Sequence, residues 1–188
     1  MNIHQLSVTY LAEQDRILMR VNTTASEEMR LWLTRRLMLG LWPLLSRLLT
    51  EHLLKLEAAG SSLETADEEL RRMLAEFRKD EFLRNADFET PYQDNHALPL
   101  GEEPLLVTDV DASPLPGGQL RLNFNEQPSG SGTPRSFQME MEPRLMQGLM
   151  HLLEQALAQS HWREAFAAPP SGEDGPADEA RPRPRYLN

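Results

Sequence analysis

Residues that alternate along two predicted strands form the chemically most informative pattern in the sequence. Arg35 and Arg36 follow these strands at the predicted start of a helix, whose N-terminus adds a small positive potential. Arginines pair with phosphates and aromatic rings stack on bases, so the set could bind single-stranded nucleic acid. If the apolar residues of the strands face a core, the opposite face carries Leu18, Arg20, Arg30 and Trp32.

The same residues also fit a protein-binding surface, because Trp and Arg are typical anchors of protein interfaces. This interpretation is favoured, since the matching face in the second half of the chain is polar but hardly basic. The outward positions there are Arg121, Asn123, Asn125, Ser136, Gln138 and Glu140.

Residue types that perform catalysis or hold metals are sparse. The chain has no cysteine, which excludes disulfides and thiolate chemistry within it. It contains no Gly-rich phosphate loop, nucleophile elbow or paired-histidine metal motif. Asp109-x-Asp111 could hold a divalent cation, and His151-x-x-Glu154 places an imidazole beside a carboxylate, but solvated surface pairs explain both better. We therefore expect no catalytic residues, no metal and no cofactor.

Alternation with a period of two predicts the strands that position these residues. Residues 5–11, 16–22 and 29–33 each alternate, which predicts a three-stranded antiparallel meander. Thr34 is the expected N-cap of a helix that runs from 35 to about 59. The side chains expected to face the core are Ile17, Met19, Val21, Met29, Leu31 and Leu33.

The sequence of this helix recurs in the second half of the chain, which indicates an internal duplication. Residues 29–49 align with 137–157 with eight identities. The identical pairs include Gly40 and Gly148, although glycine costs about 1 kcal/mol in a helix interior. We expect both glycines to allow another backbone to approach closely.

The second half repeats the order of elements. Residues 105–110, 119–125 and 136–141 are expected strands, and Pro143 at the first helical position opens a helix to about 162. The fold class is therefore α+β, with a duplicated β-β-β-α unit. The expected organisation is a first repeat (1–60), an acidic helical insertion and connector (61–103), a second repeat (104–162) and a disordered Pro-rich tail (163–188).

The first helix is apolar almost all round between residues 37 and 45, as expected of a helix covered on two sides. Three strands cover one side only. The second repeat, the insertion or a second subunit must cover the other, because monomers generally avoid large apolar patches. We expect Trp42 and Leu45 to belong to this packing or oligomer interface, together with the two glycines. A homodimer is one way to form it.

Charge and composition limit the possible partners. The net charge is −10, which opposes default binding to nucleic acid or anionic lipid. Residues 63–103 alone carry a net charge of −7. The N-terminus lacks a signal-peptide pattern, and the longest apolar run is far below the roughly 20 residues of a membrane span. Only Lys55 and Lys79 are lysines among 19 basic residues, a composition associated with GC-rich bacterial genomes. We expect a bacterial cytoplasmic protein.

The order of strands followed by a helix resembles, in topology only, the Whirly and PC4-like single-stranded nucleic-acid binders. Their sheets carry four strands before each helix, and the lysine-rich loop of Whirly proteins is absent here. The resemblance implies nucleic-acid binding by the first sheet, which is the alternative function. The primary expectation is a non-catalytic adaptor that acts through protein–protein contacts and is not an enzyme.

Overall fold

The computed structural model describes most of the chain. The described residues are 2–58, 73, 77, 84, 86–88, 90–115, 118–128, 130 and 132–163. Most of the predicted second helix and the predicted disordered tail beyond residue 163 lie outside them. Residues 73, 77 and 84, which belong to that second helix, are helical.

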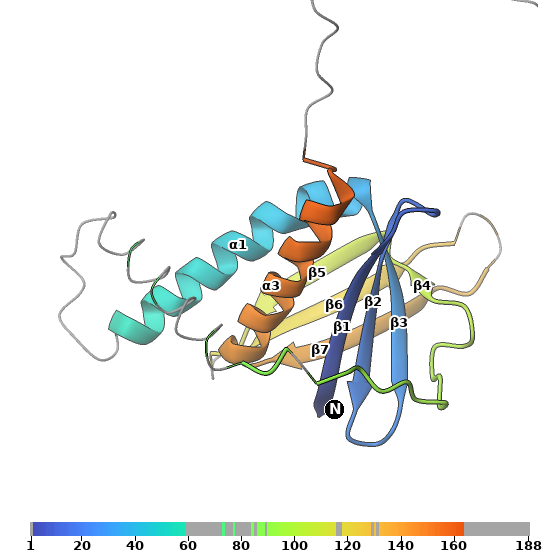
Figure 1. The fold of residues 1–188 in the computed structure, drawn as a ribbon, viewed down its shortest axis with the longest axis horizontal. Helices are drawn as coiled ribbons and strands as arrows, with labels where there is room; N and C mark the ends of the chain where they lie inside the picture. Colours follow the sequence, from blue (N-terminus) through green and yellow to red (C-terminus); the bar gives the residue numbers. More distant parts are fainter. Residues whose placement is uncertain are drawn as a thin grey trace, which may run out of the picture.

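Three antiparallel strands form most of the first sheet, which confirms the predicted meander. β1 (Ile3–Leu11), β2 (Arg16–Thr23) and β3 (Glu28–Thr34) pair in sequence order (Figure 1). Because side chains alternate between the two faces of a strand, one face of the sheet enters the core. The predicted core residues of this face are each at most 3% exposed: Ile17, Met19, Val21, Met29, Leu31 and Leu33.

Helix α1 (Arg35–Ala58) begins directly after β3. The backbone N–H of Leu37 donates to the Thr34 hydroxyl at 3.3 Å, so Thr34 caps the helix as predicted. Pro43 lies inside the helix, where its ring removes one backbone hydrogen bond. α1 therefore starts at the end of the first sheet and extends away from it (Figure 1).

A fourth strand joins the first sheet, and the sequence did not predict it. β4 (Leu105–Leu106) pairs parallel with β3, and the chain then enters a second sheet as β5 (Asp109–Pro114). The prediction of a single strand over 105–110 is therefore wrong. The N–H of Val107 donates to a carbonyl of β3 at 3.0 Å, whereas the N–H of Thr108 donates to the second sheet at 2.9 Å. The chain changes sheets between these two residues.

The second sheet contains β5, β6 (Leu120–Glu126) and β7 (Arg135–Met141), which are antiparallel and pair in that order. Helix α3 (Pro143–Ser160) follows, with Pro143 in its first turn and Glu142 as its N-cap. The buried side chains of this sheet are Leu122, Phe124, Phe137, Met139 and Met141.

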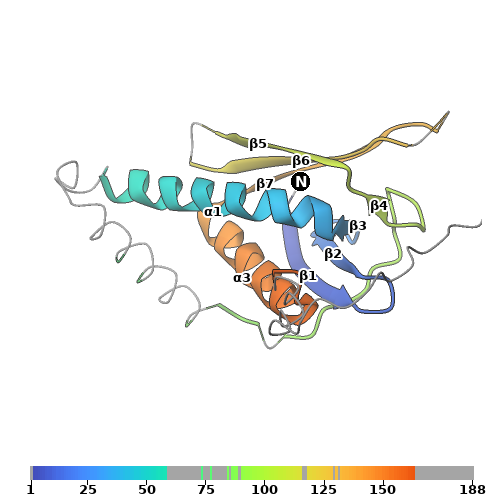
Figure 2. The ribbon, with the colours of Figure 1, turned by 90° about the horizontal axis from the view of Figure 1, so that it is seen from above.

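The two halves of the chain pack against each other. α3 packs mainly on β1 of the first sheet and also contacts α1 (Figures 1 and 2). The inner faces of both sheets and the apolar stripes of both helices belong to one hydrophobic core. Neither half therefore buries its apolar residues alone.

The two aligned glycines lie in different environments. Gly148 is buried in α3, whereas Gly40 is exposed on α1. A Cβ atom built on Gly40 would meet no atom within 4 Å, so the expected close approach of a backbone does not occur within the described residues. Leu45 is buried and Trp42 is half-buried, but Leu39 is 49% exposed. The described part of the chain thus covers α1 on one side only.

The architecture is α+β, with two sheets and two helices among the elements that the structure describes. β1, β2 and β3 precede α1, and β5, β6 and β7 precede α3. Each helix therefore follows three strands of one sheet, whereas four strands precede each helix in the Whirly-like pattern. No helix within the described ranges is long and apolar enough to cross a membrane.

Candidate functional site

A groove lies between the first turns of α1 and the segment that runs from β4 into β5. It has a volume of about 530 Å³, and α1, β5 and β6 extend from this region in the same general direction (Figure 2). The lining residues are Thr34, Arg36, Leu37, Gly40, Leu41 and Leu44 on the helix side, and Leu106, Val107, Thr108, Asp109 and Val110 on the strand side.

Most side chains that line this α1–β5 groove are apolar, but they differ in burial. Leu41 and Val107 belong to the hydrophobic core. Leu37, Leu44 and Val110 are only half-buried, so they present apolar surface at the groove. Apolar surface in a concave site is a common feature of ligand and partner binding.

Two exposed charges also line the groove. Arg36 lies in the first turn of α1 and has no hydrogen-bond or ion-pair partner among the described residues. Asp109 is exposed at the start of β5 on the other side. Among the described residues, the groove therefore combines an apolar surface with one cation and one anion that are exposed.

β5 is an edge strand. Within the described strands it pairs with β6 alone, so its other edge is not paired with a strand. Such an edge offers backbone N–H and C=O groups to a further strand. Because the start of β5 lines the groove together with α1, this edge borders the groove.

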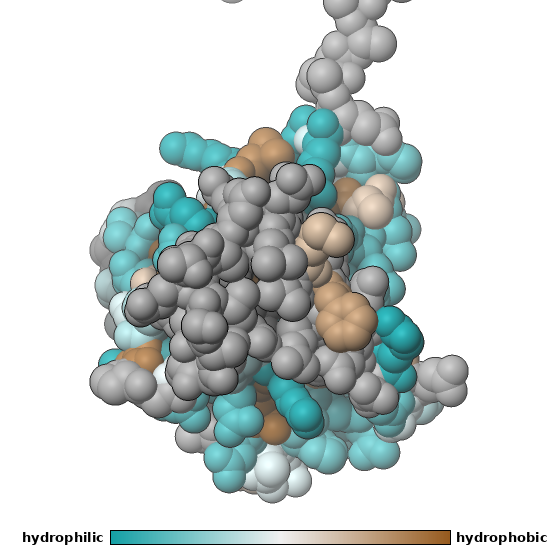
Figure 3. Space-filling model, turned by 90° about the vertical axis from the view of Figure 1, so that its left-hand side faces the viewer, coloured by the Kyte–Doolittle hydropathy of each residue, from teal (hydrophilic) through white to brown (hydrophobic). Residues whose placement is uncertain are grey.

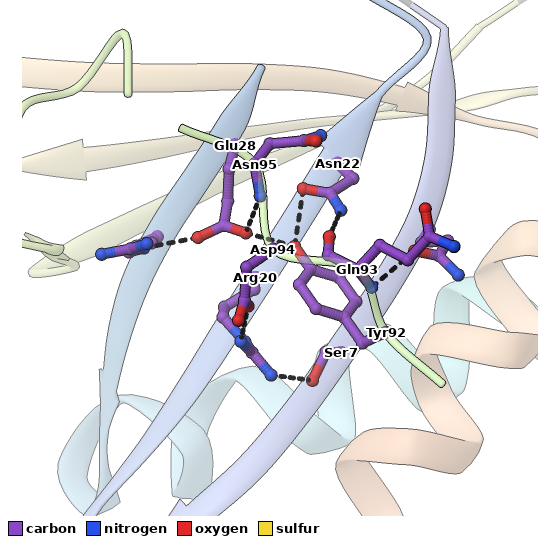
Figure 4. A network of polar contacts seen from close by, with 10 residues as sticks. Ser7, Arg20, Asn22, Glu28, Tyr92, Gln93, Asp94 and Asn95 are labelled. Carbon is purple, nitrogen blue, oxygen red and sulfur yellow. Dashed lines mark hydrogen bonds and ion pairs between the residues drawn. The ribbon is translucent and has the colours of Figure 1, made fainter. Parts of the chain in front are cut away.

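The outer face of the first sheet, where the binding residues were predicted, is crossed by part of the connector. Residues 90–97 form this cover and are termed the strap (Figure 4). Arg20 pairs with Asp94 at 2.6 Å and donates to the Ser7 hydroxyl at 3.2 Å. Its guanidinium carbon also lies 4.2 Å from the centroid of the Tyr92 ring. Arg20 therefore has intramolecular partners on several sides.

Glu28 is the buried centre of the strap contact, with only 1% of its surface exposed. It accepts hydrogen bonds from Arg30 at 2.5 Å, from the Tyr92 hydroxyl at 3.1 Å and from the Asn95 N–H at 3.3 Å (Figure 4). Burial raises the pKa of Glu28, but these hydrogen bonds outweigh it and hold the pKa below its usual value. Burial, and then the Glu28 charge, raise the pKa of Tyr92 well above its usual value.

Further hydrogen bonds hold the main chain of the strap. The Asn22 side chain donates to the Gln93 carbonyl, and the Gln93 N–H donates to the Gln5 side chain at 3.1 Å. At the other end, the Glu28 N–H donates to the Ala97 carbonyl at 2.8 Å. The connector lacks a hydrophobic period, so the sequence did not indicate that it would cover this face.

The predicted binding residues therefore do not form one open basic surface. Arg20 and Arg30 pair with carboxylates of the same chain. Leu18 and Trp32 lie opposite each other in the strand register and are half-buried.

Arg35 takes part in a different contact, at the end of α3. It donates to the Trp162 carbonyl at 3.1 Å, and the Trp162 ring N–H donates to Asp15 at 2.6 Å. The Trp162 ring also meets the Tyr10 ring edge-on, with centroids 5.6 Å apart. The hydrogen bonds from Trp162 and Tyr10 lower the pKa of Asp15. Of the predicted arginines, Arg36 is the one that the described chain leaves available.

An ion pair that sequence reasoning missed fixes the strand side of the groove. Arg135 donates to Glu126 at 2.5 Å and to the carbonyls of Leu100 and Glu103 at 2.8 and 3.1 Å. Glu126 in turn accepts the Leu106 N–H at 2.9 Å. The hydrogen bond between them lowers the pKa of Glu126 and raises that of Arg135. The sequence contained one indication of this pair, since Glu126 and Arg135 carry opposite charges at the two ends of the predicted hairpin loop.

Asp111 and His151, which belong to the pairs that the sequence suggested for a metal or for acid–base chemistry, each contact other residues. Asp111 accepts a hydrogen bond from Asn125 at 3.1 Å. His151 lies beside the Phe88 ring, with centroids 4.9 Å apart, and 2.9 Å from the Gln155 amide. Among the described residues, no group of three or more His, Asp or Glu side chains could hold a metal ion.

Exposed apolar side chains also occur away from the groove. Figure 3 views the end of the molecule where α1 terminates, and shows both hydrophobic and hydrophilic groups among the coloured residues. The large hydrophobic residues exposed on the described chain are Leu39, Met73, Phe77 and Phe88.

Comparison of the chain with protein-family models, with curated proteins and with solved structures gives no match. The α1–β5 groove is the candidate site on geometry alone.

Proposed function

We propose that this chain is a non-catalytic adaptor that binds a segment of a partner protein in the α1–β5 groove. The groove itself carries the proposal, because it combines half-buried Leu37, Leu44 and Val110 with Gly40, where an added Cβ would meet no atom of the described chain within 4 Å. Its volume of about 530 Å³ lies within the range of about 300–1,000 Å³ that is usual for binding sites.

The contacts of the first sheet favour a protein partner over single-stranded nucleic acid. A nucleic acid would need the cations of that face to pair with phosphates. Arg20 is paired with Asp94 and Arg30 with Glu28. The net charge of −10 further opposes the approach of a polyanion.

We further propose that the two β-β-β-α units arose by duplication in a bacterial cytoplasmic protein. α1 begins at Arg35 and α3 at Pro143, which is the same offset as between Gly40 and Gly148 in the sequence alignment. The absence of cysteine from the chain suits a reducing compartment.

Photo-crosslinking from the groove tests the adaptor function. A benzophenone amino acid replaces Leu44 in the full chain, which is irradiated in cells of the source organism. We expect a covalent protein adduct that disappears when Gly40→Leu fills the groove. The same probe at Gln138, which is exposed on the outer face of the second sheet, is the control and should give no adduct that depends on Gly40.

Two outcomes contradict the adaptor proposal. The first is a set of Leu44 adducts that Gly40→Leu does not change, because such adducts would not depend on the groove. The second is an adduct removed by nuclease, accompanied by single-stranded DNA binding whose log affinity falls linearly with log salt concentration. That result would identify the protein as a nucleic-acid binder.

A further inference from the structure

We propose that the partner segment binds as an added β-strand on the free edge of β5, with an acidic side chain beside Arg36. This inference rests on the adaptor function proposed above and specifies the chemistry of its partner. The partner is an extended segment in which apolar side chains alternate and one Asp or Glu lies at the end nearest the start of α1.

The free edge of β5 is the first reason for an extended partner. β5 pairs with β6 on one side only among the described strands. A strand added there satisfies the backbone groups of the edge, while every second side chain of the added strand points to one face. On the groove side those side chains would meet the half-buried Leu37, Leu44 and Val110. A helical partner would leave the edge unpaired.

Gly40 is the second reason. Glycine destabilises a helix interior, and nothing in the described chain approaches this position, since an added Cβ would have no atom within 4 Å. Gly40 nevertheless lines the groove, and a longer side chain there would project into it. A partner that passes close to α1 would explain why a glycine stands here, whereas the described part of the fold does not explain it.

Charge complementarity specifies the acidic residue. Arg36 is exposed, lines the groove and has no partner in the described part of the chain. It also lies in the first turn of α1, where the helix dipole favours a negative charge. Asp109 on the strand side disfavours a second acidic residue next to β5. One acidic residue flanked by alternating apolar positions is therefore the expected pattern.

Selection from a displayed library of random peptides tests this pattern. The library peptides are about ten residues long, enough to follow one edge strand, and the immobilised target is the full chain. The binding affinity of the selected peptides is then measured for the wild type and for the variants Gly40→Leu, Arg36→Glu and Arg47→Glu. Arg47 is the matched control, because it is an arginine of the same helix with a side chain that is 69% exposed and that does not line the groove.

We expect the selected peptides to share the acidic and alternating apolar pattern. Gly40→Leu and Arg36→Glu should each weaken their binding by about tenfold or more, as is usual for loss of a central contact or charge pair. Arg47→Glu should leave the affinity within about twofold, as expected for an exposed charge outside the site. Methylation of single backbone nitrogens in the best peptide should weaken binding at every second residue, because N–H groups alternate in direction along a strand.

The outcomes separate this inference from the adaptor function. Peptides that depend on Gly40 but lack the acidic residue, or show no alternation under methylation, overturn the inference and leave the adaptor function standing. If no selected peptide depends on Gly40, both fail. If sedimentation shows a wild-type dimer that Gly40→Leu converts to a monomer, the groove binds a second copy of the chain and the peptide proposal is overturned.

Discussion

α1 and α3 carry an aligned sequence motif, yet they are covered differently. On the side that faces the core the two helices agree, since Leu45 of α1 and Leu153 of α3 are each 1% exposed. At the aligned glycines they differ, because Gly40 is exposed and Gly148 is buried. The motif therefore determines the stripe that enters the core, whereas the environment of the remaining positions depends on the neighbouring elements.

The outer faces of the two sheets differ in the same way. The strap covers the first sheet and encloses Glu28, whereas the outer face of the second sheet carries the exposed pair of Arg121 and Glu140, 2.8 Å apart. Arg20 and Arg121, on the outer faces of the two sheets, both pair with carboxylates, but the partner of Arg20 belongs to the strap and that of Arg121 to a strand of its own sheet. The four predictions below test these contrasts.

The largest effect is expected where α3 meets the first sheet. Trp162→Ala should lower the free energy of unfolding by about 3–5 kcal/mol, because Trp162 is 3% exposed and its ring contacts Tyr10 and Asp15. Trp42→Ala on α1 should cost less, since Trp42 is half-buried. Urea denaturation measures both variants. Equal losses would show that α1 is covered as closely as the end of α3.

The second-largest loss of stability is expected from the buried leucines of the two helices, and it should be similar in both. Leu45→Ala and Leu153→Ala should each cost about 2–5 kcal/mol by transfer and cavity formation. Leu39→Ala, at a position that is 49% exposed, should stay within about 0.5 kcal/mol. A loss at Leu39 as large as at Leu45, measured by the same denaturation, would refute the one-sided cover of α1.

The strap should make stability depend on pH through Glu28. The pKa of Glu28 in the folded protein is lowered. Its ionised carboxyl therefore contributes fully to stability above the pKa in the unfolded chain, which is about 4.3. The contribution is lost as the pH falls through the folded pKa. Glu28→Gln should cost about 1–3 kcal/mol at neutral pH, the usual range for a buried hydrogen-bonded charge.

Denaturation at a series of pH values isolates the share of Glu28. The difference in the free energy of unfolding between the wild type and Glu28→Gln should shrink as the pH falls below the pKa of this carboxyl in the unfolded chain. Glu140→Gln is the control on the open sheet and should have an effect below about 1 kcal/mol, because exposed pairs contribute little. A difference at Glu28 that stays constant to low pH would contradict the assigned ionisation.

The smallest expected effect is a difference between the two aligned glycines of the helices. Gly40→Ala should raise the free energy of unfolding by up to about 1 kcal/mol, because alanine favours a helix and its Cβ would meet no atom within 4 Å. Gly148→Ala should give a smaller gain or a loss, since Gly148 is buried. Thermal unfolding compares the two. An equal gain at both positions would remove the distinction between them.

The strands that face the core could be predicted because their alternation has a direct physical cause. Ile17, Met19 and Val21 point to the core, while the residues between them, Leu18 and Arg20, point to the opposite face. The break between β4 and β5 could not be predicted in this way. Val107 and Thr108 continue the same pattern, while the change of sheet depends on hydrogen bonds to β3 and β6.

The candidate site was predictable only in part, because it is formed by contacts between distant segments. The sequence indicated Arg36 as a candidate binding residue and Gly40 as an unusual mid-helix glycine. It did not indicate that residues 106–110 line the same groove, or that Asp94 of the connector pairs with Arg20. Neither contact follows from a local period or motif, since each joins segments about 70 residues apart.

The docking of α3 on β1 has a consequence for how the chain is made. The first sheet leaves the ribosome early, but the helix that covers β1 arrives only with residues 143–160. Until Trp162 has been synthesised, Tyr10 and its apolar neighbours on β1 lack their partner. Contacts of such sequence separation slow folding and leave apolar strands open to association during translation. We therefore expect nascent chains that stop before α3 to aggregate or to require a chaperone.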